Sequence, residues 1–458
     1  MSEIVNSSAS PGCDDQWLIK IKNAGTEETT GDKGTHFPRV PPTFRDIQQN
    51  SDCYDPSVVS IGPYHHGKAK LNEMEKLKET YASQFALDST KQIDEIYRGV
   101  KAELISIAKN RYPEDARRNF NDEQLAKMIF LDGCFILQFL FCLYMKPGNL
   151  KMSSHNAALV KKDLFLLENQ LPFEVLTKLA SFRNPDQRAW TKILTAFCDQ
   201  VRAFPGGTDL KEKITKFFRE LQKALTTRNP EAPHQPAAVH LLELLHKRFC
   251  SGTIVSENFE NSSCNSNSQM NWYRYYPAEE LRNIGIHFKP SKTDLFTDVQ
   301  FKRGWLITRS LYIPPLRIDN STRSLLLNLV AYETCHGASN ESRVTSYVCF
   351  MDSLIDTPRD VQVLRSKGIL LNTLGSDEQA AELFNQIASH LIPDPYAYIQ
   401  VKSSIEKEHR KVLKKWVAMW LRVYFKSPWT FIAFVAATFT IILTAIQTFI
   451  ALFPLKDQ

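Results

Sequence analysis

Residues 62–69, GPYHHGKA, come closest to a catalytic motif in this chain. Their spacing fits GxxxxGK, the loop in which backbone N–H groups and a lysine hold nucleotide phosphates. However, Ala69 stands where a Ser or Thr hydroxyl would hold magnesium, and Pro63 removes one backbone donor. We therefore expect a tight turn in which Gly62 and Gly67 relieve backbone strain, and no bound nucleotide.

Three polar residues could form a site only if the fold brought them together: His65, Asp132 and Glu168. Paired buried carboxylates can do acid–base chemistry, but more often such groups cap a helix or pair with a basic side chain. His65 and His66 point apart in an extended chain and have no partner at a recognised metal-ligand spacing. We expect no catalytic residue, no metal and no cofactor. A membrane-bound enzyme assembled from the three is the alternative.

Other catalytic signatures are missing from the sequence. It has no GxSxG, HExxH, Rossmann or kinase motif, and Cys335-His336 lacks a context that would activate a nucleophile. The nine cysteines are an odd number, are scattered and form no CxxC pair, which fits a reducing compartment. These observations favour a non-enzymatic protein.

The elements that would position these residues are mainly helical between residues 71 and 245. Residues 125–145 are apolar almost all round, but they include Lys127, Asp132 and Gln138. We expect them to form the central helix of a soluble bundle, with a second membrane span as the alternative. Pro172 bends or divides the next apolar segment, and residues 213–225 and 237–249 continue the helical pattern.

After a low-complexity stretch at residues 257–269, the hydrophobic period changes. Short strands are predicted at residues 285–290, 295–302, 305–309 and 311–318, followed by helices at 321–335, 342–355, 360–374 and 376–392. Ser376 and Gln379 resemble a capping box. The predicted fold class is mainly α. A disordered tail (residues 1–40) precedes a mostly helical globular domain (residues 41–400) with a small β insertion in its C-terminal half.

The stretch from Trp429 to Phe453 contains no Asp, Glu, Lys, Arg or His. Its polar residues are threonines and Gln447. As a helix it reaches roughly 37 Å, enough to cross a hydrocarbon core of about 30 Å. The sequence therefore predicts a transmembrane helix at residues 428–453 with a short tail at 454–458. A buried core helix is the other interpretation.

Residues 401–427 form a predicted basic amphipathic helix before this span. Residues 401–426 contain eight Lys or Arg and two Asp or Glu, a balance of +6 that equals the charge of the whole chain. The remainder is neutral, so we expect no nucleic-acid partner. The predicted membrane-surface residues are Lys411, Lys414, Lys415, Trp416, Trp420, Arg422 and Lys426. Alternatively, the apolar side of this helix packs on the domain, and the sequence leaves both open.

The basic residues before the span, against Lys456 after it, predict a cytosolic N-terminal domain. The first residues also lack the basic and apolar regions of a signal peptide. We therefore expect a tail-anchored, single-pass protein, with the plasma membrane as the expected location and the lipid bilayer and an unidentified protein as partners.

Several sequence blocks resemble a plant family called domain of unknown function 247. They include VSIGPYHHGKAKLNEMEKLK, MIFLDGCFIL, DLFLLENQLPFEVL and SPWTFIAFVAA, and the resemblance covers roughly residues 41 to 453 in the expected order. Glu174 departs from the family pattern, which usually has an aromatic residue there. The resemblance implies a plant single-pass membrane protein without established catalytic residues. Some grass members are associated with self-incompatibility, which suggests recognition or signalling.

Overall fold

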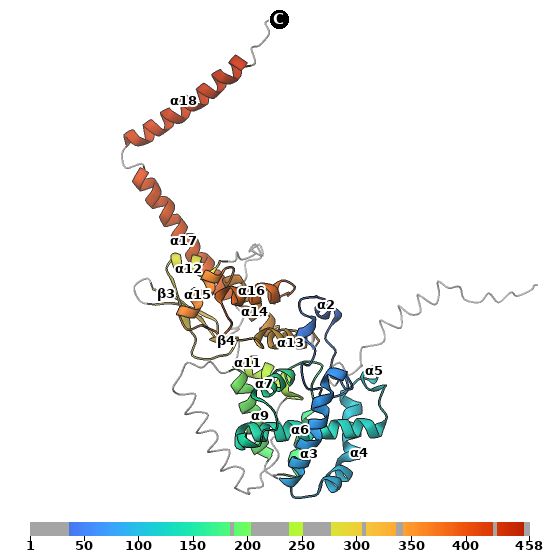
Figure 1. Ribbon diagram of the computed structural model, residues 1–458. Helices are drawn as coiled ribbons and strands as arrows, with labels where there is room; N and C mark the ends of the chain where they lie inside the picture. The colour runs from blue at the N-terminus through green and yellow to red at the C-terminus, as the bar shows by residue number, and fades with distance from the viewer. Residues whose placement is uncertain are drawn as a thin grey trace, which may run out of the picture.

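The computed structural model describes residues 36–183, 187–202, 238–250, 276–304, 308–335, 342–424 and 428–452. Most of the predicted tail (residues 1–35), the predicted helix at 213–225, the low-complexity stretch at 257–269 and Lys426 lie outside the described residues. The described part is mainly helical, with small sheets in its C-terminal half (Figure 1). This confirms the predicted fold class of the globular domain.

The N-terminal half is a helical bundle arranged around one long helix, α6 (Asp122–Met145). Asn121 caps α6 and forms a reciprocal capping box with Gln124. The other helices that the structure describes in this half are α2 (Pro42–Arg45), η1 (Ser51–Cys53), η2 (Ala69–Leu71), α3 (Asn72–Leu87), α4 (Ile93–Arg111), α5 (Glu114–Arg117), η3 (Pro147–Asn149), α7 (Ser154–Asp163), α8 (Phe173–Ala180), α9 (Gln187–Arg202) and α11 (Leu241–Cys250).

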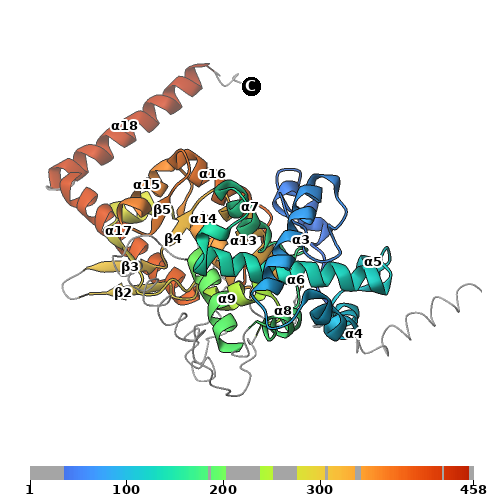
Figure 2. The ribbon, with the colours of Figure 1, turned by 60° about the horizontal axis from the view of Figure 1, so that its bottom comes forward.

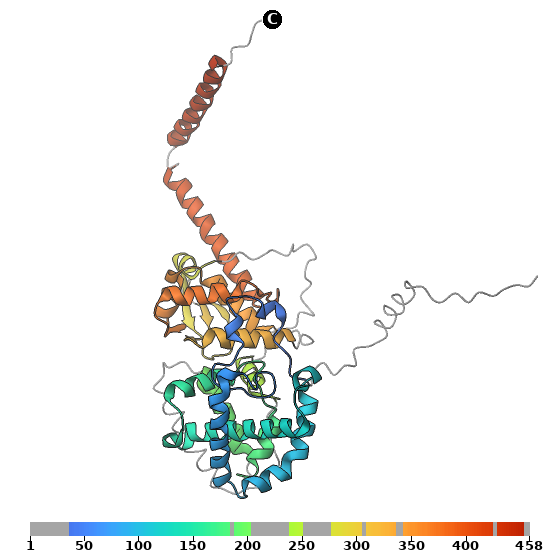
Figure 3. The same cartoon turned by 45° about the vertical axis from the view of Figure 1, so that its right-hand side comes forward.

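Helix α6 is buried among α3, α4, α8 and α9, as the predicted central helix of a soluble bundle should be (Figure 3). Among the residues whose side chains the structure describes, it is the one helix long and apolar enough to span a bilayer, and most of its surface lies inside the protein; Val435–Thr448 form a shorter apolar stretch. Gly133 lies at its crossing with α8. A Cβ at Gly133 would come 2.4 Å from Leu179 and 3.2 Å from Val175, so the close approach of the two helices requires glycine.

The C-terminal half places two small sheets among helices. Strand β3 (Arg309–Ile313) pairs in parallel with β1 (Ile286–Pro290) and antiparallel with β2 (Gln300–Arg303). A second, parallel pair joins β4 (Leu316–Ile318) to β5 (Leu370–Asn372). The helices of this half are α12 (Ala278–Asn283), α13 (Thr322–Cys335), α14 (Arg343–Leu354), α15 (Pro358–Ser366) and α16 (Asp377–Ala388) (Figure 2).

The structure corrects four of the predicted elements. The predicted strand at 295–302 is strand only from Gln300, where β2 begins. The predicted strand at residues 311–318 is two strands in different sheets, because prolines at 314 and 315 cannot continue a ladder. The predicted strand at 305–309 is only the start of β3 where it is described. The predicted helix at 360–374 ends at Ser366; Gly368 then adopts a φ of +72°, and β5 follows.

Two helices leave the globular body in sequence. Helix α17 (Ile399–Tyr424) begins against the first sheet, and α18 (Pro428–Leu452) lies apart from the body in Figures 1 and 3. Their bounds lie close to those of the predicted helices at residues 401–427 and 428–453. The capping motif at α16 is half formed: Ser376 accepts from the amide of Gln379, whose own side chain accepts from Gly375.

We predict that Gly133→Ala destabilises the protein by about 1–3 kcal/mol, because the added methyl overlaps α8 in a packed core. Chemical denaturation of the full chain measures this. Gly99→Ala in α4 is the matched control, since nothing lies within 4 Å of that Cβ position. It should stabilise the protein by up to about 1 kcal/mol through helix propensity. Equal effects of the two substitutions would contradict the packing argument.

Candidate functional site

Residues 36–68, which we call the N-terminal strap, run across the bundle with little regular secondary structure. Their buried amides therefore need acceptors outside a helix or sheet. Asp163, at the end of α7, accepts from the amides of residues 57, 58 and 59 at 2.7–3.1 Å. The side chain of Asn169 accepts from the amide of Ile61 at 2.6 Å and donates to the carbonyls of Val59 and Asp163. The strap is thus held mainly by side chains of the segment 163–170.

The predicted turn at residues 62–67 is part of this strap. Gly62 and Gly67 have φ values of +70° and +84°, as the turn interpretation requires. Gly62 is also confined, because a Cβ there would come 2.7 Å from the Tyr112 hydroxyl. The Gly62 amide donates to Asp132 at 2.8 Å. One of the donors that a phosphate loop would offer therefore binds a carboxylate of the protein itself.

Asp132 and Lys78 form a buried ion pair beneath the turn. The two side chains are 1% and 0% exposed, and Lys78 Nζ lies 2.5 Å from Asp132 Oδ1. Lys78 also donates to the Ser60 carbonyl and to Glu75. Burial raises the pKa of Asp132 above its ordinary value, against the opposing influence of the Lys78 ammonium. Of the two structural roles expected for such a carboxylate, capping a helix or pairing with a basic group, Asp132 has the second.

Glu168 has a different set of partners at the other end of the strap. Its carboxylate accepts from the Val40 amide at 2.8 Å and from Arg45 at 2.7 Å. His65 Nε2 lies 3.4 Å from the same carboxylate. Burial alone would raise the pKa of Glu168, but His65, Arg45 and the Val40 amide together hold it below its ordinary value.

His65, Asp132 and Glu168 therefore lie against one segment but do not share one set of contacts. His65 lies beside Glu168, whereas Asp132 forms an ion pair with Lys78 and accepts a hydrogen bond from the Gly62 amide. All three are buried. His66 faces elsewhere, 3.7 Å from Glu75. The arrangement supports a structural role for both carboxylates. The His65–Glu168 contact is the one observation that remains in favour of a catalytic site built from these three residues.

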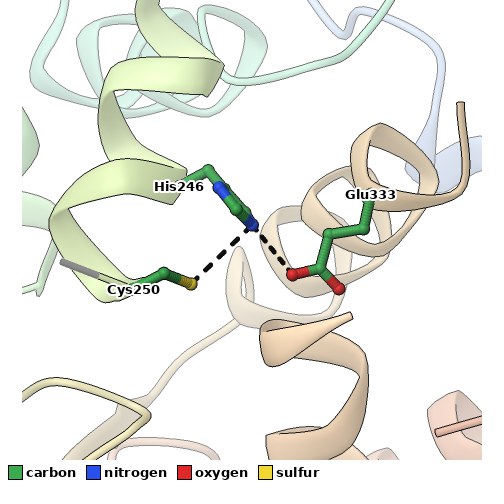
Figure 4. Close-up of side chains that lie close together, drawn as sticks. All are labelled: His246, Cys250 and Glu333. Atoms are coloured by element: carbon green, nitrogen blue, oxygen red, sulfur yellow. Dashed lines mark hydrogen bonds and ion pairs between the residues drawn. The ribbon is translucent and has the colours of Figure 1, made fainter. Parts of the chain in front are cut away.

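A second cluster was not singled out from the sequence: His246, Cys250 and Glu333 (Figure 4). His246 and Cys250 lie one helical turn apart on α11, and their Nε2 and Sγ atoms are 3.7 Å apart. His246 Nε2 is 2.8 Å from Glu333 Oε1 on α13. Imidazole, thiol and carboxylate are the donor types that Zn²⁺ accepts, so the three could serve as ligands. The i, i+4 spacing of His246 and Cys250 was the available signal; Glu333 is distant in sequence.

The Glu333 carboxylate also forms hydrogen bonds with the start of α14. Oε1 accepts from the Val344 amide at 2.8 Å, and Oε2 accepts from the amide and hydroxyl of Thr345 at 2.9 and 2.7 Å. It therefore caps the first turn of α14 as well as accepting from His246. One carboxylate thus joins α11, α13 and α14, which accounts for the cluster without an ion.

The predicted membrane-surface residues are described only in part. Lys411 is exposed and lies 3.0 Å from Glu408 in the same helix. The side chains of Lys414, Lys415, Trp416, Trp420 and Arg422 in α17 are outside what the structure describes, as is Lys426. Of the two interpretations of this helix, packing on the domain holds for its first turns, where Val401 and Ile405 are buried.

Comparison with known proteins gives a consistent family assignment. The family model DUF247, described as a plant protein of unknown function, matches residues 37–443. The chain is 29% identical to the UPF0481 protein At3g47200 of Arabidopsis thaliana, over 93% of this chain and 88% of that protein. It is 23% identical to the putative UPF0481 protein At3g02645 of the same plant, over 88% of each. No solved structure matches. Glu174, the departure from the family pattern, is partly exposed and pairs with Arg111.

We predict that Lys78→Met destabilises the full chain by about 3 kcal/mol or more, because it leaves Asp132 buried without its cation. Urea denaturation followed by circular dichroism measures the loss. Lys76→Met, on an exposed position of the same helix, is the control and should change stability by less than about 0.5 kcal/mol. A Lys78 variant as stable as the Lys76 variant would mean that the pair does not fasten the strap.

Proposed function

This chain belongs to the plant family DUF247, a family of unknown function, and from that premise we propose that it is a membrane-tethered, non-enzymatic interaction protein. Its helical domain would present a surface to a protein partner in recognition or signalling. Helix α18 would be the tether and α17 the connection. The observation that carries the proposal is the surface of α18.

Helix α18 displays large apolar side chains to its surroundings. Seven of them are between 44% and 69% exposed: Ile432, Val435, Phe439, Ile441, Ile442, Leu443 and Ile446. No charged residue occurs between 429 and 453. An exposed apolar surface of this kind is unfavourable in water and favourable in hydrocarbon. Lipid is the surrounding that this composition suits.

The polar groups of α18 are also suited to lipid. Thr440, Thr444 and Thr448 each donate their hydroxyl to the carbonyl four residues earlier, at 2.8 Å. Hydroxyls satisfied within the helix need no water. With 25 residues at about 1.5 Å each, the helix reaches roughly 37 Å, enough for a bilayer core.

Helix α17 supplies a firm connection between the tether and the domain. Glu408 lies 2.7 Å from Arg309 on β3 and 2.9 Å from Arg303 on β2. His409 Nε2 is 2.9 Å from Glu280, and its ring stacks on Tyr276 at 4.2 Å. These contacts support a tether whose first turns belong to the domain. The basic residues further along α17 would then face anionic lipid of the cytosolic leaflet of the plasma membrane.

The proposed role does not require catalysis. Confinement to a surface raises the effective concentration of a domain and its partner without new contacts between them. The carboxylates considered for catalysis hold the strap through Lys78, Arg45 and backbone amides, which supports an interaction protein over an enzyme built from His65, Asp132 and Glu168.

We predict that the full-length protein stays with the membrane pellet after alkaline carbonate washing, because an embedded helix is not released by removing electrostatic contacts. A variant ending at Ser427 should move to the supernatant. Immunoblotting of both fractions measures the distribution. Release of the full-length protein would refute α18 as a tether.

We also predict that the variant ending at Ser427 binds phosphatidylserine-containing vesicles, and that changing Lys411, Lys415, Arg422 and Lys426 to Gln weakens this binding. Each basic residue near an anionic surface contributes about 1 kcal/mol. Vesicle flotation measures the bound fraction. The control changes four exposed lysines of the globular body, Lys70, Lys76, Lys151 and Lys292, to Gln. Equal losses in both variants would argue against a specific basic side of α17.

A further inference from the structure

A cavity of about 290 Å³ lies where the two halves of the globular body meet. Its walls come from α7, α9 and α11 on one side and from β4 and the start of α13 on the other; Figure 1 shows these elements near the junction of the halves. Ligand sites in proteins are often found in such clefts between structural units. None of the residues discussed above for catalysis or metal binding lines it.

The charged residues that line the cavity are mostly cationic. They are Lys161, Lys162, Arg317 and Asp319, a formal balance of +2. Lys162 donates to the Ser57 hydroxyl at 3.2 Å, and Arg317 lies 3.4 Å from Asp319. Lys161 has neither a hydrogen bond nor an ion pair among the described residues. Among the described residues, Lys161 is thus the lining cation for which no hydrogen-bond or ion-pair partner is found, and Lys162 has only a hydroxyl.

Lys161 is also partly removed from water. Burial lowers the pKa of its ammonium below the ordinary value, and no charged neighbour offsets that effect. A partly desolvated ammonium is stabilised most by an anion placed against it. The start of α13, at Thr322, also lines the cavity, but the Asp319 carboxylate accepts from the Ser321 amide and hydroxyl there, so this helix end adds little positive potential for a ligand.

Much of the remaining wall is apolar, beside the polar residues Gln200, Ser321, Thr322 and Ser324. Phe165, Phe249 and Leu326 are buried side chains that line the cavity, and Val201 and Leu325 are partly buried beside them. An inorganic ion alone would leave this surface against water, whereas an organic molecule would cover it. The wall therefore selects for a ligand with an apolar body beside its charged group.

We propose that this cavity binds a small soluble organic anion, with a phosphate or carboxylate group against Lys161 and an apolar body against Phe165 and Phe249. Lys162 and Arg317 contribute the surrounding positive field. The competing account is that the Lys161 stem only covers apolar surface and its ammonium reaches water. The two accounts differ in whether removing the charge changes the binding of an anion.

The test measures binding of phenyl phosphate to the full chain in phosphatidylcholine nanodiscs by titration calorimetry. Inorganic phosphate supplies the charge without the apolar body, and benzyl alcohol supplies an aromatic body without the charge. We expect saturable binding of phenyl phosphate, with both other probes weaker. Lys161→Gln should weaken phenyl phosphate binding by about tenfold to a hundredfold, the loss expected for a charge-assisted contact.

Two variants keep the result interpretable. Lys151→Gln removes the same charge from an exposed position just before α7 and should leave binding within about twofold, since one distant surface charge is screened. Lys161→Arg keeps the charge and should retain most of the affinity. The proposal is overturned if phenyl phosphate does not bind, if benzyl alcohol binds equally well, or if Lys161→Gln behaves like Lys151→Gln.

Discussion

The fold depends on how the N-terminal strap satisfies its buried backbone. Residues 36–68 contain little helix and no strand in the described chain, yet several of their amides are removed from water. An unpaired buried amide is costly, so each needs an acceptor. Asp163, Glu168 and Asn169 supply most of these acceptors from one short segment between α7 and α8. The polar residues in the otherwise apolar DLFLLENQLPF sequence are therefore structural.

The same segment joins the two halves of the body. The side chain of Asn328 on α13 accepts from the amide of Leu167 at 2.8 Å and donates to the carbonyl of Cys53 at 2.9 Å. The buried side-chain amide of Asn328 thus joins the strap, the 163–170 segment and the C-terminal half. The cavity beside Lys161 opens next to this junction and is lined by residues of both halves, so a bound ligand would contact both of them.

Local pattern predicted much of the fold. The apolar run of α6 with its few charges indicated a buried helix, and the alternating residues after 285 indicated strands. Where prediction failed, the information was not local. The Leu-rich residues 369–371 are compatible with helix or strand, and the pairing of β5 with β4 decides between them. The sequence indicated that Asp132 would cap a helix or pair with a basic group, but only the fold identifies Lys78 as its partner. Glu333 and Lys161 gave no signal at all, because their surroundings come from distant segments.

Helix α17 belongs to the domain at its start and leaves it at its end. Glu408 pairs with Arg303 on β2 and Arg309 on β3, and His409 lies against Glu280 on α12, so these contacts favour one orientation of the first turns on the domain. A helix is stiff in torsion over a few turns because every turn is hydrogen-bonded to the next. The rotation of α17 about its own axis is therefore set by the domain. Whatever binds the far end of α17 then determines which side of the globular body faces outward.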